Sequence, residues 1–396
     1  MKFTGSLREN LIVAALTLLL TLVGTELFLR FLNPEVDQFY IWPPGYEAVF
    51  DPGDAFSTPG VEGPGRFEIN SLGLRGDERP QDTELDLFVF GGSTAVEIYL
   101  DQDEIWSQQI GARLNAVETN PRVWVGLLAR SSMATLHNAL MFEHLVPQLP
   151  QPDLILNLVG VNDMQLALRT SYLPDMTAED HMNWTFAQRP SQKSFLESLA
   201  ITRFYRRIKA WQDKAEIGVV ETFGADGRVS WRKCRQSAPE EKLVRAVPDL
   251  HSELAAYEER IIQLADAGSE YGAPTIFLTQ PTLWADNMSA EALAQLHTGG
   301  IGPSSDWCTK QEYYAPGTLA VSMRMFNKRL LETCKKANLV CYDLARDVPK
   351  EARYFYDDMH FSEAGATLVA ELVTTEIMRL NTRGELDLAK LSGDQP

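Results

Sequence analysis

Four residues from three distant parts of the sequence are of the types that acyl transfer needs: Ser93, Asn162, Asp357 and His360. A serine hydroxyl becomes an effective nucleophile when a base removes its proton, and histidine is the base suited to neutral pH. A carboxylate beside the far nitrogen of the imidazole fixes its tautomer and orientation. Asp357 and His360 stand three residues apart, so a turn-like loop can bring them together. The set predicts a nucleophilic serine with its base and its orienting acid.

Such a site also needs hydrogen-bond donors for the oxyanion of the tetrahedral intermediate. The backbone N–H of Ser93 and the side-chain amide of Asn162 are the candidates. Asp358 is an alternative orienting acid, two residues from His360, whereas Asp163 is interpreted as a structural acceptor at its turn. The remaining histidines are interpreted as surface or packing residues: His137, His144, His181, His251 and His297.

The segments that must position these residues alternate between strand and helix patterns. Apolar runs predict strands within 85–94, 123–125, 153–160, 274–281 and 339–343. Helical spacing of apolar residues predicts helices over 102–117, 133–146, 250–271, 319–337 and 362–380. This alternation is typical of a three-layer α/β/α domain with a central, mostly parallel five-stranded sheet and right-handed crossovers.

Ser93 follows the first of these strands. Gly91 and Gly92 allow the backbone to bend without a Cβ penalty, before a helix that is expected to begin near Glu104. A serine at that bend lies at the carboxyl end of the sheet, where open α/β folds place their ligands. Taken alone, the stretch is more typical of an ordinary Gly-rich loop. The downstream asparagine and Asp–His pair favour the functional interpretation.

The same residues resemble the sequence blocks of the SGNH subgroup of the GDSL hydrolases, a family of serine esterases and lipases, over most of residues 85–380. Gly91-Gly92-Ser93-Thr94 resembles the first block, Gly160-Val-Asn-Asp163 the third and Asp357-Asp-Met-His360 the fifth. The resemblance implies a flavodoxin-like fold. It also implies that Ser93 is the nucleophile, Asn162 an oxyanion donor, His360 the general base and Asp357 its orienting acid.

Two positions depart from the family pattern. The first block usually has an aspartate before the serine, where this chain has Gly92; that aspartate is neither nucleophile nor base. In the second block, Leu127-Leu-Ala-Arg-Ser-Ser132 puts Ser132 where the family has a glycine whose N–H faces the oxyanion. Ser132 is the expected third donor if its backbone conformation is open to L-residues. Upstream, Asn70-x-x-Gly-x-Arg75 resembles the lead-in of membrane-anchored members.

The amino-terminal segment is typical of a membrane helix. Residues 11–25 carry no charge, and the apolar run continues to residue 32, which is about the length needed to cross a bilayer. Glu26 and Arg30, four residues apart, can pair on one helix face. The alternative, a buried core helix, would need apolar packing on every side.

No small-residue cleavage site follows the apolar run, so residues 11–32 are expected to be an uncleaved signal anchor. Lys2 and Arg8 in the flank 1–10 predict a cytoplasmic amino end and a large domain on the other side of the membrane.

The rest of the chain divides by composition. Residues 33–82 are rich in proline and glycine, and we expect an extended connector without regular elements. Residues 83–382 form the expected SGNH hydrolase domain, with an insertion at about 164–248 whose aromatic and basic residues lack a clear period. Residues 282–317 are a candidate lid, and residues 383–396 are expected to be a flexible tail.

The chain has 396 residues and a formal net charge of −18, which argues against nucleic acid or anionic lipid as its main partner. Its four cysteines show no C-x-x-C spacing, so neither a metal site nor a cofactor is expected. Outside the cytoplasm they can form disulfides, with Cys334 and Cys341 the nearest pair among Cys234, Cys308, Cys334 and Cys341. Buried free thiols are the alternative.

These features predict a membrane-anchored serine esterase whose catalytic domain faces the periplasm or the exterior. The expected substrate is an O-acyl ester, preferably acetyl, of a cell-envelope carbohydrate or lipid. The alternatives are an O-acyltransferase with the same acyl-enzyme, and a non-catalytic envelope-binding module that keeps the sheet. Specificity is expected to lie in the insertion and the lid. Trp184 and Trp284 can line an acyl or sugar pocket, although large aromatic residues usually pack in the core.

Overall fold

A computed structural model describes residues 7–32, 38–53, 58–168, 176–187, 199–202, 204–205, 220–221, 225–302 and 304–391. The chain forms two units, which are described separately: residues 1–38 with 189–219, and residues 39–188 with 220–396. Lys2, much of the insertion between residues 169 and 224, and residues 392–396 of the tail lie outside the described residues.

The larger unit is built on a five-stranded sheet in the order β4-β3-β5-β8-β10, in which every neighbouring pair is parallel. The strands are β3 (Leu85–Gly91), β4 (Val123–Ala129), β5 (Leu154–Leu158), β8 (Thr275–Leu278) and β10 (Val340–Tyr342). Each overlaps one of the five runs predicted as strands. Numbered along the chain within this sheet, the order is 2-1-3-4-5, the flavodoxin-like arrangement. The predicted fold class is confirmed.

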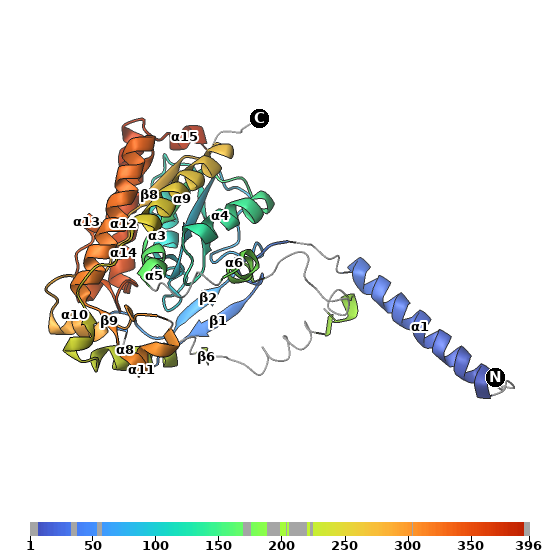
Figure 1. The fold of residues 1–396 in the computed structure, drawn as a ribbon. Coiled ribbons are helices and arrows are strands. Elements are labelled where there is room, and N and C mark those ends of the chain that lie inside the picture. Colours follow the sequence, from blue (N-terminus) through green and yellow to red (C-terminus); the bar gives the residue numbers. More distant parts are fainter. Residues whose placement is uncertain are drawn as a thin grey trace. The chain divides into compact units, whose positions relative to one another are not determined.

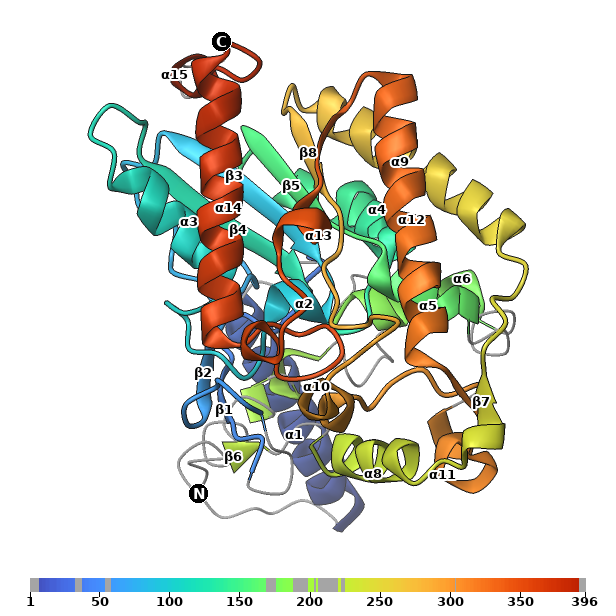
Figure 2. The same ribbon diagram turned by 90° about the vertical axis from the view of Figure 1, so that its left-hand side faces the viewer.

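Helices cover both faces of the sheet (Figure 2). On one face pack α3 (Trp106–Asn115) and α14 (Glu363–Thr382); on the other pack α4 (Thr135–His144), α9 (His251–Glu270) and α12 (Pro316–Ala337). β3 shows why both faces need cover. Leu87 and Val89 belong to one core, whereas Phe88 and Phe90 belong to the other.

Short helices link these elements: α2 (Ser93–Val96), η1 (Val146–Gln148), α5 (Val161–Leu168), α13 (Leu344–Asp347) and η4 (Ala352–Tyr354). Part of the predicted flexible tail is helical as well. Helix α15 (Leu388–Leu391) forms there, and Leu388 is buried in the core that contains α3 and α14. Apolar packing therefore orders a segment for which the sequence predicted flexibility.

The connector contains regular structure, contrary to expectation. β1 (Glu47–Phe50) pairs antiparallel with β2 (Gly65–Glu68) and parallel with β6 (Val220–Glu221), which comes from the insertion. The proline and glycine pairs of the connector suit turns, but Phe50 and Phe67 between them are buried. Their rings pack edge to face at 5.3 Å. Phe50 and Phe67 belong to the core on the α3 and α14 face of the sheet, and their burial stabilises strands that the local composition does not predict.

Residues 225–236 of the insertion pack against residues 290–295 and 307–310 of the predicted lid at the carboxyl end of the sheet (Figure 1). The insertion adds α6 (Ala178–Thr185), α8 (Ala225–Gln236), η2 (Glu240–Lys242) and β7 (Leu243–Val244). The lid segment adds α10 (Ala290–Gln295), η3 (Ser304–Asp306), α11 (Trp307–Lys310) and β9 (Tyr313–Tyr314). β7 pairs with β9, and a disulfide between Cys234 and Cys308 joins α8 to α11. A second disulfide joins Cys334 and Cys341, the pair nearest in sequence.

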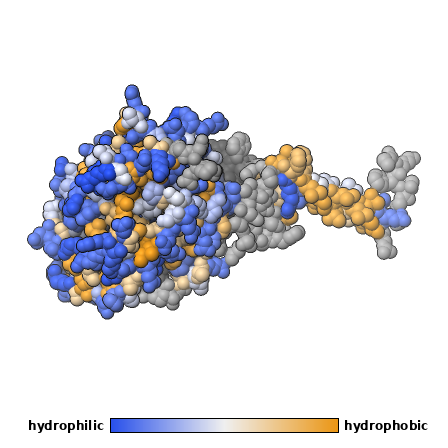
Figure 3. Space-filling model, turned by 90° about the horizontal axis from the view of Figure 1, so that it is seen from above, coloured by the Kyte–Doolittle hydropathy of each residue, from blue (hydrophilic) through white to orange (hydrophobic). Residues whose placement is uncertain are grey.

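The smaller unit contains α1 (Leu7–Leu32). Its residues Glu9–Leu32 form a helix long and apolar enough to cross a membrane, and none of that apolar window is buried. Figure 3 shows its surface as mostly hydrophobic, with hydrophilic residues near its ends. Arg30 donates to Glu26 at 2.7 Å, the pair predicted at this spacing. The helix is not packed in a core, and it is compatible with a membrane anchor or a signal sequence.

Candidate active site

The loop before α14 brings the predicted base and acid together. The Nδ1 atom of His360 lies 2.8 Å and 2.7 Å from the two carboxylate oxygens of Asp357. Asp357 also accepts backbone N–H bonds from Met359 and His360, at 3.0 Å and 2.9 Å. The backbone N–H of Tyr356 donates to the carbonyl of His360 at 3.1 Å and closes the turn. Both side chains are buried, so the ring and the carboxylate are held in one orientation.

Ser93 and His360 line the same cavity, whose volume is about 240 Å³. Asn162 and Ser132 line it as well. Asp357 contacts the imidazole at Nδ1. The Nε2 atom of His360 is buried and makes no hydrogen bond within the described part of the chain. Since the other ring nitrogen faces the carboxylate, Nε2 is the atom suited to take the proton of Ser93.

Ser93 is the first residue of a short helix, not part of a long loop. The sequence led us to expect the next helix near Glu104, but α2 begins directly after Gly92. A Cβ at Gly91 would lie 2.6 Å from the Cβ of Ala95 one helical turn later. Glycine at that position therefore allows the strand to turn sharply into the helix that presents the serine hydroxyl.

Arg75 of the lead-in motif holds this turn from behind. Its buried guanidinium donates to the backbone carbonyls of Val96, Glu97 (2.8 Å) and Leu100 (2.6 Å). The same group lies 4.7 Å from the centroid of the Phe67 ring. Burial lowers the pKa of Arg75 to about 10, so the group keeps its charge at neutral pH. The lead-in motif is a brace for the segment that carries the candidate nucleophile.

Arg75→Lys is expected to lower kcat for ester hydrolysis by about 10-fold at unchanged KM, because an ammonium cannot bond three carbonyls as a planar guanidinium does. Arg79→Lys is the matched control. Arg79 pairs with Asp86 through bonds of 2.7 Å and 2.8 Å near the opposite end of β3, so this variant should lose thermal stability but keep kcat. Steady-state kinetics and thermal unfolding of both variants test the brace. A wild-type kcat in Arg75→Lys would contradict it.

Asn162 lies in the first turn of α5, where the sequence suggested only a turn. Its Nδ2 atom donates to the carbonyl of Met133 at 2.8 Å. A Cβ at Gly92 would collide with this amide nitrogen. Glycine at position 92 therefore leaves the space that the amide occupies in this chain.

Asn162→Ala is expected to lower kcat by about 10²–10³-fold, because an oxyanion donor acts mainly in the transition state. KM for a small ester should change little. An Asn162→Asp variant of the same shape cannot donate when it is ionised, and it should lose at least as much activity. Initial rates with p-nitrophenyl acetate measure both effects. Full activity in either variant would remove Asn162 from the oxyanion hole.

Ser132 adopts a φ of +66°, in the left-handed region that glycine enters without strain. The expectation of a third oxyanion donor here required a conformation open to L-residues. An L-residue can enter this region at a cost of about 1–2 kcal/mol, so the serine adopts the conformation that a glycine would have here. The backbone course typical of glycine is thus retained at the mouth of the cavity despite the substitution.

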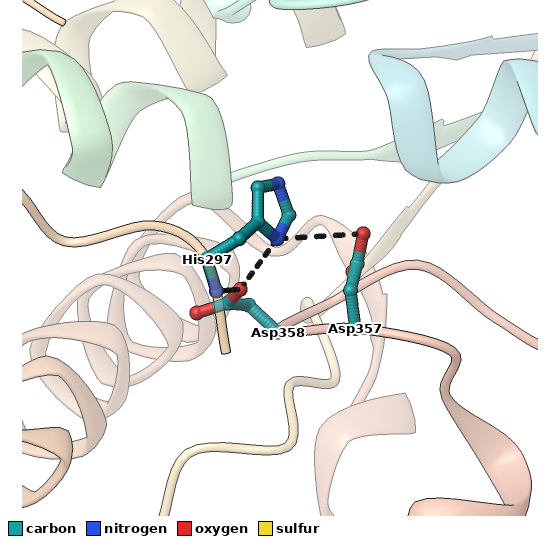
Figure 4. Close-up of side chains that lie close together, drawn as sticks. All are labelled: His297, Asp357 and Asp358. Atoms are coloured by element: carbon teal, nitrogen blue, oxygen red, sulfur yellow. Dashed lines mark hydrogen bonds and ion pairs between the residues drawn. The ribbon is translucent and has the colours of Figure 1, made fainter. Parts of the chain in front are cut away.

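Asp358 holds a different segment of the chain. Its oxygens accept bonds from the indole N–H of Trp284 (2.9 Å) and from the backbone N–H and the hydroxyl of Thr298 (3.2 Å and 2.8 Å). The backbone N–H of His297 donates to it at 2.7 Å, and Nδ1 of the same histidine lies 2.8 Å from Oδ2 (Figure 4). The geometry therefore favours Asp357 over Asp358 as the orienting acid.

His297 lies in the cavity, where sequence reasoning did not place it. Its Nδ1 atom is 3.8 Å from Oδ2 of Asp357 (Figure 4). One weak signal in the sequence pointed to it, the position of this histidine in the candidate lid. Asp163, in contrast, behaves as interpreted from the sequence, because it accepts a bond from the hydroxyl of Thr135 at 2.5 Å.

Helix α8 carries three arginines at helical spacing, Arg228, Arg232 and Arg235, beside the two adjacent buried carboxylates. Arg235 donates to the carbonyl of Thr298 at 2.6 Å, and Arg228 lies 5.3 Å from the ring centroid of Tyr99. Two neighbouring acids are costly to bury without compensating charge. The insertion helix therefore supplies cations beside the two carboxylates.

These charges set the protonation states of the pair. Burial by itself would raise the pKa of Asp357, but His360 and His297 hold it far below its ordinary range, and Arg228 adds to their effect. The pKa of His360 is lowered from 6.5, chiefly by burial and further by Arg228, although Asp357 opposes the shift. The base is therefore neutral at neutral pH.

The acid limb of kcat/KM for a small acetyl ester is expected to have its midpoint below pH 6.5, because the base must be neutral and its pKa is lowered. Arg228→Gln removes a neighbouring cation, so it should raise the pKa of His360 and move the midpoint to higher pH. The stability of the folded protein depends on pH in the same direction. The contribution of the neutral His360 ring is present above pH 6.5 and is lost as the pH falls, because the unfolded chain binds the proton more tightly. A pH–rate profile of both proteins provides the measurement. A downward move in Arg228→Gln would contradict the assignment.

The ligand atoms of His297, Asp357 and Asp358 lie within 4.8 Å of one another, a spacing that could hold a metal ion. However, both oxygens of Asp357 face His360. The oxygens of Asp358 already accept bonds from the indole and from two backbone N–H groups and a hydroxyl of the lid segment. The donor set does not fit a resident metal.

Three tryptophans line the cavity: Trp184, Trp231 and Trp307. Trp231 from α8 and Trp307 from α11 have ring centroids 5.2 Å apart, and the disulfide between these two helices holds their backbones together. Trp284 is fully buried and donates to Asp358, so it serves the packing role that large aromatics usually have.

No protein-family model matches this chain, and no curated protein matches it. Several solved structures are similar. The lipase/acylhydrolase from Enterococcus faecalis is 14% identical, with 74% of this chain and 95% of that chain covered and a TM-score of 0.38. A catalytic mutant of Axe2, an acetylxylan esterase from Geobacillus stearothermophilus, is 12% identical (75% and 96% covered, TM-score 0.39). Est24, a carbohydrate acetylesterase from Sinorhizobium meliloti, is 9% identical (75% and 99% covered, TM-score 0.38). At these TM-scores the likeness establishes no activity, so function rests on the site itself.

Proposed function

We propose that this protein is a membrane-anchored serine esterase of the SGNH type, which hydrolyses a short O-acyl ester, preferably acetyl, of a cell-envelope carbohydrate or lipid. The observation that carries the proposal is a buried His360–Asp357 pair, 2.7 Å apart at its closest, in one cavity with Ser93 and Asn162. The order of the resembling sequence blocks agrees with it.

In the first half of the reaction, Nε2 of His360 takes the proton of Ser93 as the serine oxygen bonds to the ester carbonyl carbon. Asn162 and the backbone N–H groups of Ser93 and Ser132 donate to the oxyanion. The ester C–O bond then breaks, and His360 gives the proton to the leaving alcohol. In the second half, a water gives a proton to His360 and attacks the acyl-enzyme. The carboxylic acid leaves as the proton returns to Ser93.

The size and lining of the cavity favour a compact substrate that contains a sugar ring. A volume of about 240 Å³ is small for a ligand site, and it suits a short acyl group with one ring better than a long lipid chain. The indoles of Trp184 and Trp231, which are partly exposed, offer apolar surfaces for the faces of a pyranose, whereas Trp307 is buried and packs against Trp231. The partly buried side chain of Gln165, which also lines the cavity, offers bonds to hydroxyl groups.

A fluorophosphonate probe tests the proposal directly, because it reacts only with an activated serine. We expect one labelled peptide, with the modification on Ser93. Absence of labelling in folded protein would favour the alternative of a non-catalytic envelope-binding module. Product analysis with an unacylated glycan present then separates hydrolysis, which releases free acid, from O-acyl transfer, which acylates the glycan.

The proposed location follows from α1 and the disulfides. A helix of this length and composition fits a signal anchor, and two disulfides among the described residues suit an oxidising compartment outside the cytoplasm. Lys2 and Arg8 favour a cytoplasmic amino end. An alkaline phosphatase fused to the carboxyl end should be active, since this reporter folds only outside the cytoplasm.

A further inference from the structure

The cavity contains a second buried histidine–aspartate pair beside the first. The side chain of His297 is 4% exposed, and its Nδ1 atom lies 2.8 Å from Oδ2 of Asp358. That carboxylate is fixed by the indole of Trp284 and by Thr298, as well as by the backbone N–H of His297 itself. A carboxylate at Nδ1 fixes the tautomer and the orientation of an imidazole. The backbone of His297 is thus anchored to Asp358, and two carboxylates lie close to its Nδ1 atom.

The side of the reaction that this ring faces follows from the geometry of acyl transfer. The general base must reach both the serine oxygen and the leaving oxygen, so the alcohol part of an ester lies over the base. The carbonyl oxygen points the other way, toward Asn162 and Ser132. His297 lies with the base, since Nδ1 is 3.8 Å from Oδ2 of Asp357 (Figure 4). Trp307, which also lines the cavity, lies ten residues further along the same segment.

We propose that His297, oriented by Asp358, binds a hydroxyl group of the alcohol part of the substrate, next to the scissile ester oxygen. The preferred substrate is then an ester of a polyhydroxylated ring, in which a free hydroxyl neighbours the acylated one. This inference rests on the proposed esterase function and deepens it, because it names the alcohol that the enzyme selects. His297 is a specificity-determining residue, and His360 remains the general base.

Two acetate esters that differ by one hydroxyl provide the test. Cyclohexyl acetate presents the ring alone, whereas trans-2-hydroxycyclohexyl acetate adds one hydroxyl beside the ester. The wild-type protein is expected to prefer the hydroxylated ester in kcat/KM by about 10-fold or more, the value of one buried hydrogen bond to a fixed partner. The ratio of the two rates cancels any general loss of folding or catalysis.

Two substitutions separate the two nitrogens of the ring. His297→Asn puts an amide near the position of Nδ1, so it keeps a partner for Asp358 but loses the distal atom. His297→Gln puts its amide near the position of Nε2. We expect His297→Asn to lose the preference for the hydroxylated ester and His297→Gln to keep part of it. His144→Asn is the control, since His144 stacks on the ring of Phe39 and does not line the cavity. It should keep the wild-type ratio.

The outcome is decided by the ratio and by labelling of Ser93. If His297→Asn keeps the wild-type ratio, or if it lowers both rates equally, His297 does not read the hydroxyl and the inference is overturned. Labelling of Ser93 by the fluorophosphonate probe in the same variant shows that the esterase assignment stands regardless. If the wild-type protein shows no preference between the two esters, the inference fails as well. Failure of labelling in the wild-type protein would instead overturn the proposed function.

Discussion

Ser93→Ala is expected to lower kcat/KM for an acetyl ester by about 10⁴-fold or more, because it removes the hydroxyl that forms the acyl-enzyme. The backbone N–H of residue 93, the Asn162 amide and the cavity all remain. A small residual rate above the uncatalysed reaction is therefore expected, from oxyanion stabilisation and binding alone. The fold should be unaffected, since Ser93 is only partly buried and alanine suits the first turn of a helix.

The matched control is Ser131→Ala, which removes a second serine hydroxyl that lines the same cavity. This variant should keep the activity and the fluorophosphonate labelling of the wild-type protein, whereas Ser93→Ala should lose both. Thermal unfolding of the two variants should agree with that of the parent. If Ser93→Ala retains ester hydrolysis, or if Ser131→Ala loses the fluorophosphonate labelling, the assignment of Ser93 as the nucleophile is wrong.

Asp357→Asn is expected to lower kcat by about 10⁴-fold with little change in KM. An asparagine of the same shape can present its N–H to Nδ1 of His360, which then lies 2.7–2.8 Å from a donor in place of an acceptor. The proton moves to Nε2, and that nitrogen can no longer accept the proton of Ser93. The fold changes little because the two residues have nearly equal volumes.

Asp358→Asn is the companion variant, since it makes the same change at the next residue, which is equally buried. Its amide cannot satisfy all of the donors of Trp284, Thr298 and His297, so stability should fall by about 1–3 kcal/mol. The kcat for p-nitrophenyl acetate should stay within a few-fold of the wild-type value, because this ester has no hydroxyl and a good leaving group. A larger loss of kcat in Asp358→Asn than in Asp357→Asn would exchange the roles of the two acids.

Much of the larger unit could be predicted because its signals are local. The apolar run 85–90 alternates between two cores on opposite faces of a sheet, so it must be a buried strand whatever surrounds it. Asp357 and His360 are close in sequence, so their contact depends on one loop. Ser93 and Asn162 follow strands that pair in parallel, and the carboxyl ends of such strands meet.

The tertiary structure decided what depends on contacts between distant segments. The strands of the connector exist because Phe50 and Phe67 find a core elsewhere in the chain. His297 enters the cavity because Asp358, 61 residues away, fixes its backbone and lies beside its ring. Arg75 donates to backbone carbonyls within residues 96–100, which are distant in sequence, so no local pattern predicts these hydrogen bonds. The sequence by itself determined the strands of the sheet and the order of the candidate catalytic residues, since strand patterns and short loops depend on neighbours in the chain. Only the tertiary structure decided which residues line the cavity and which groups pair with each buried charge. These residues are close in space but distant in sequence, so local patterns do not reveal them.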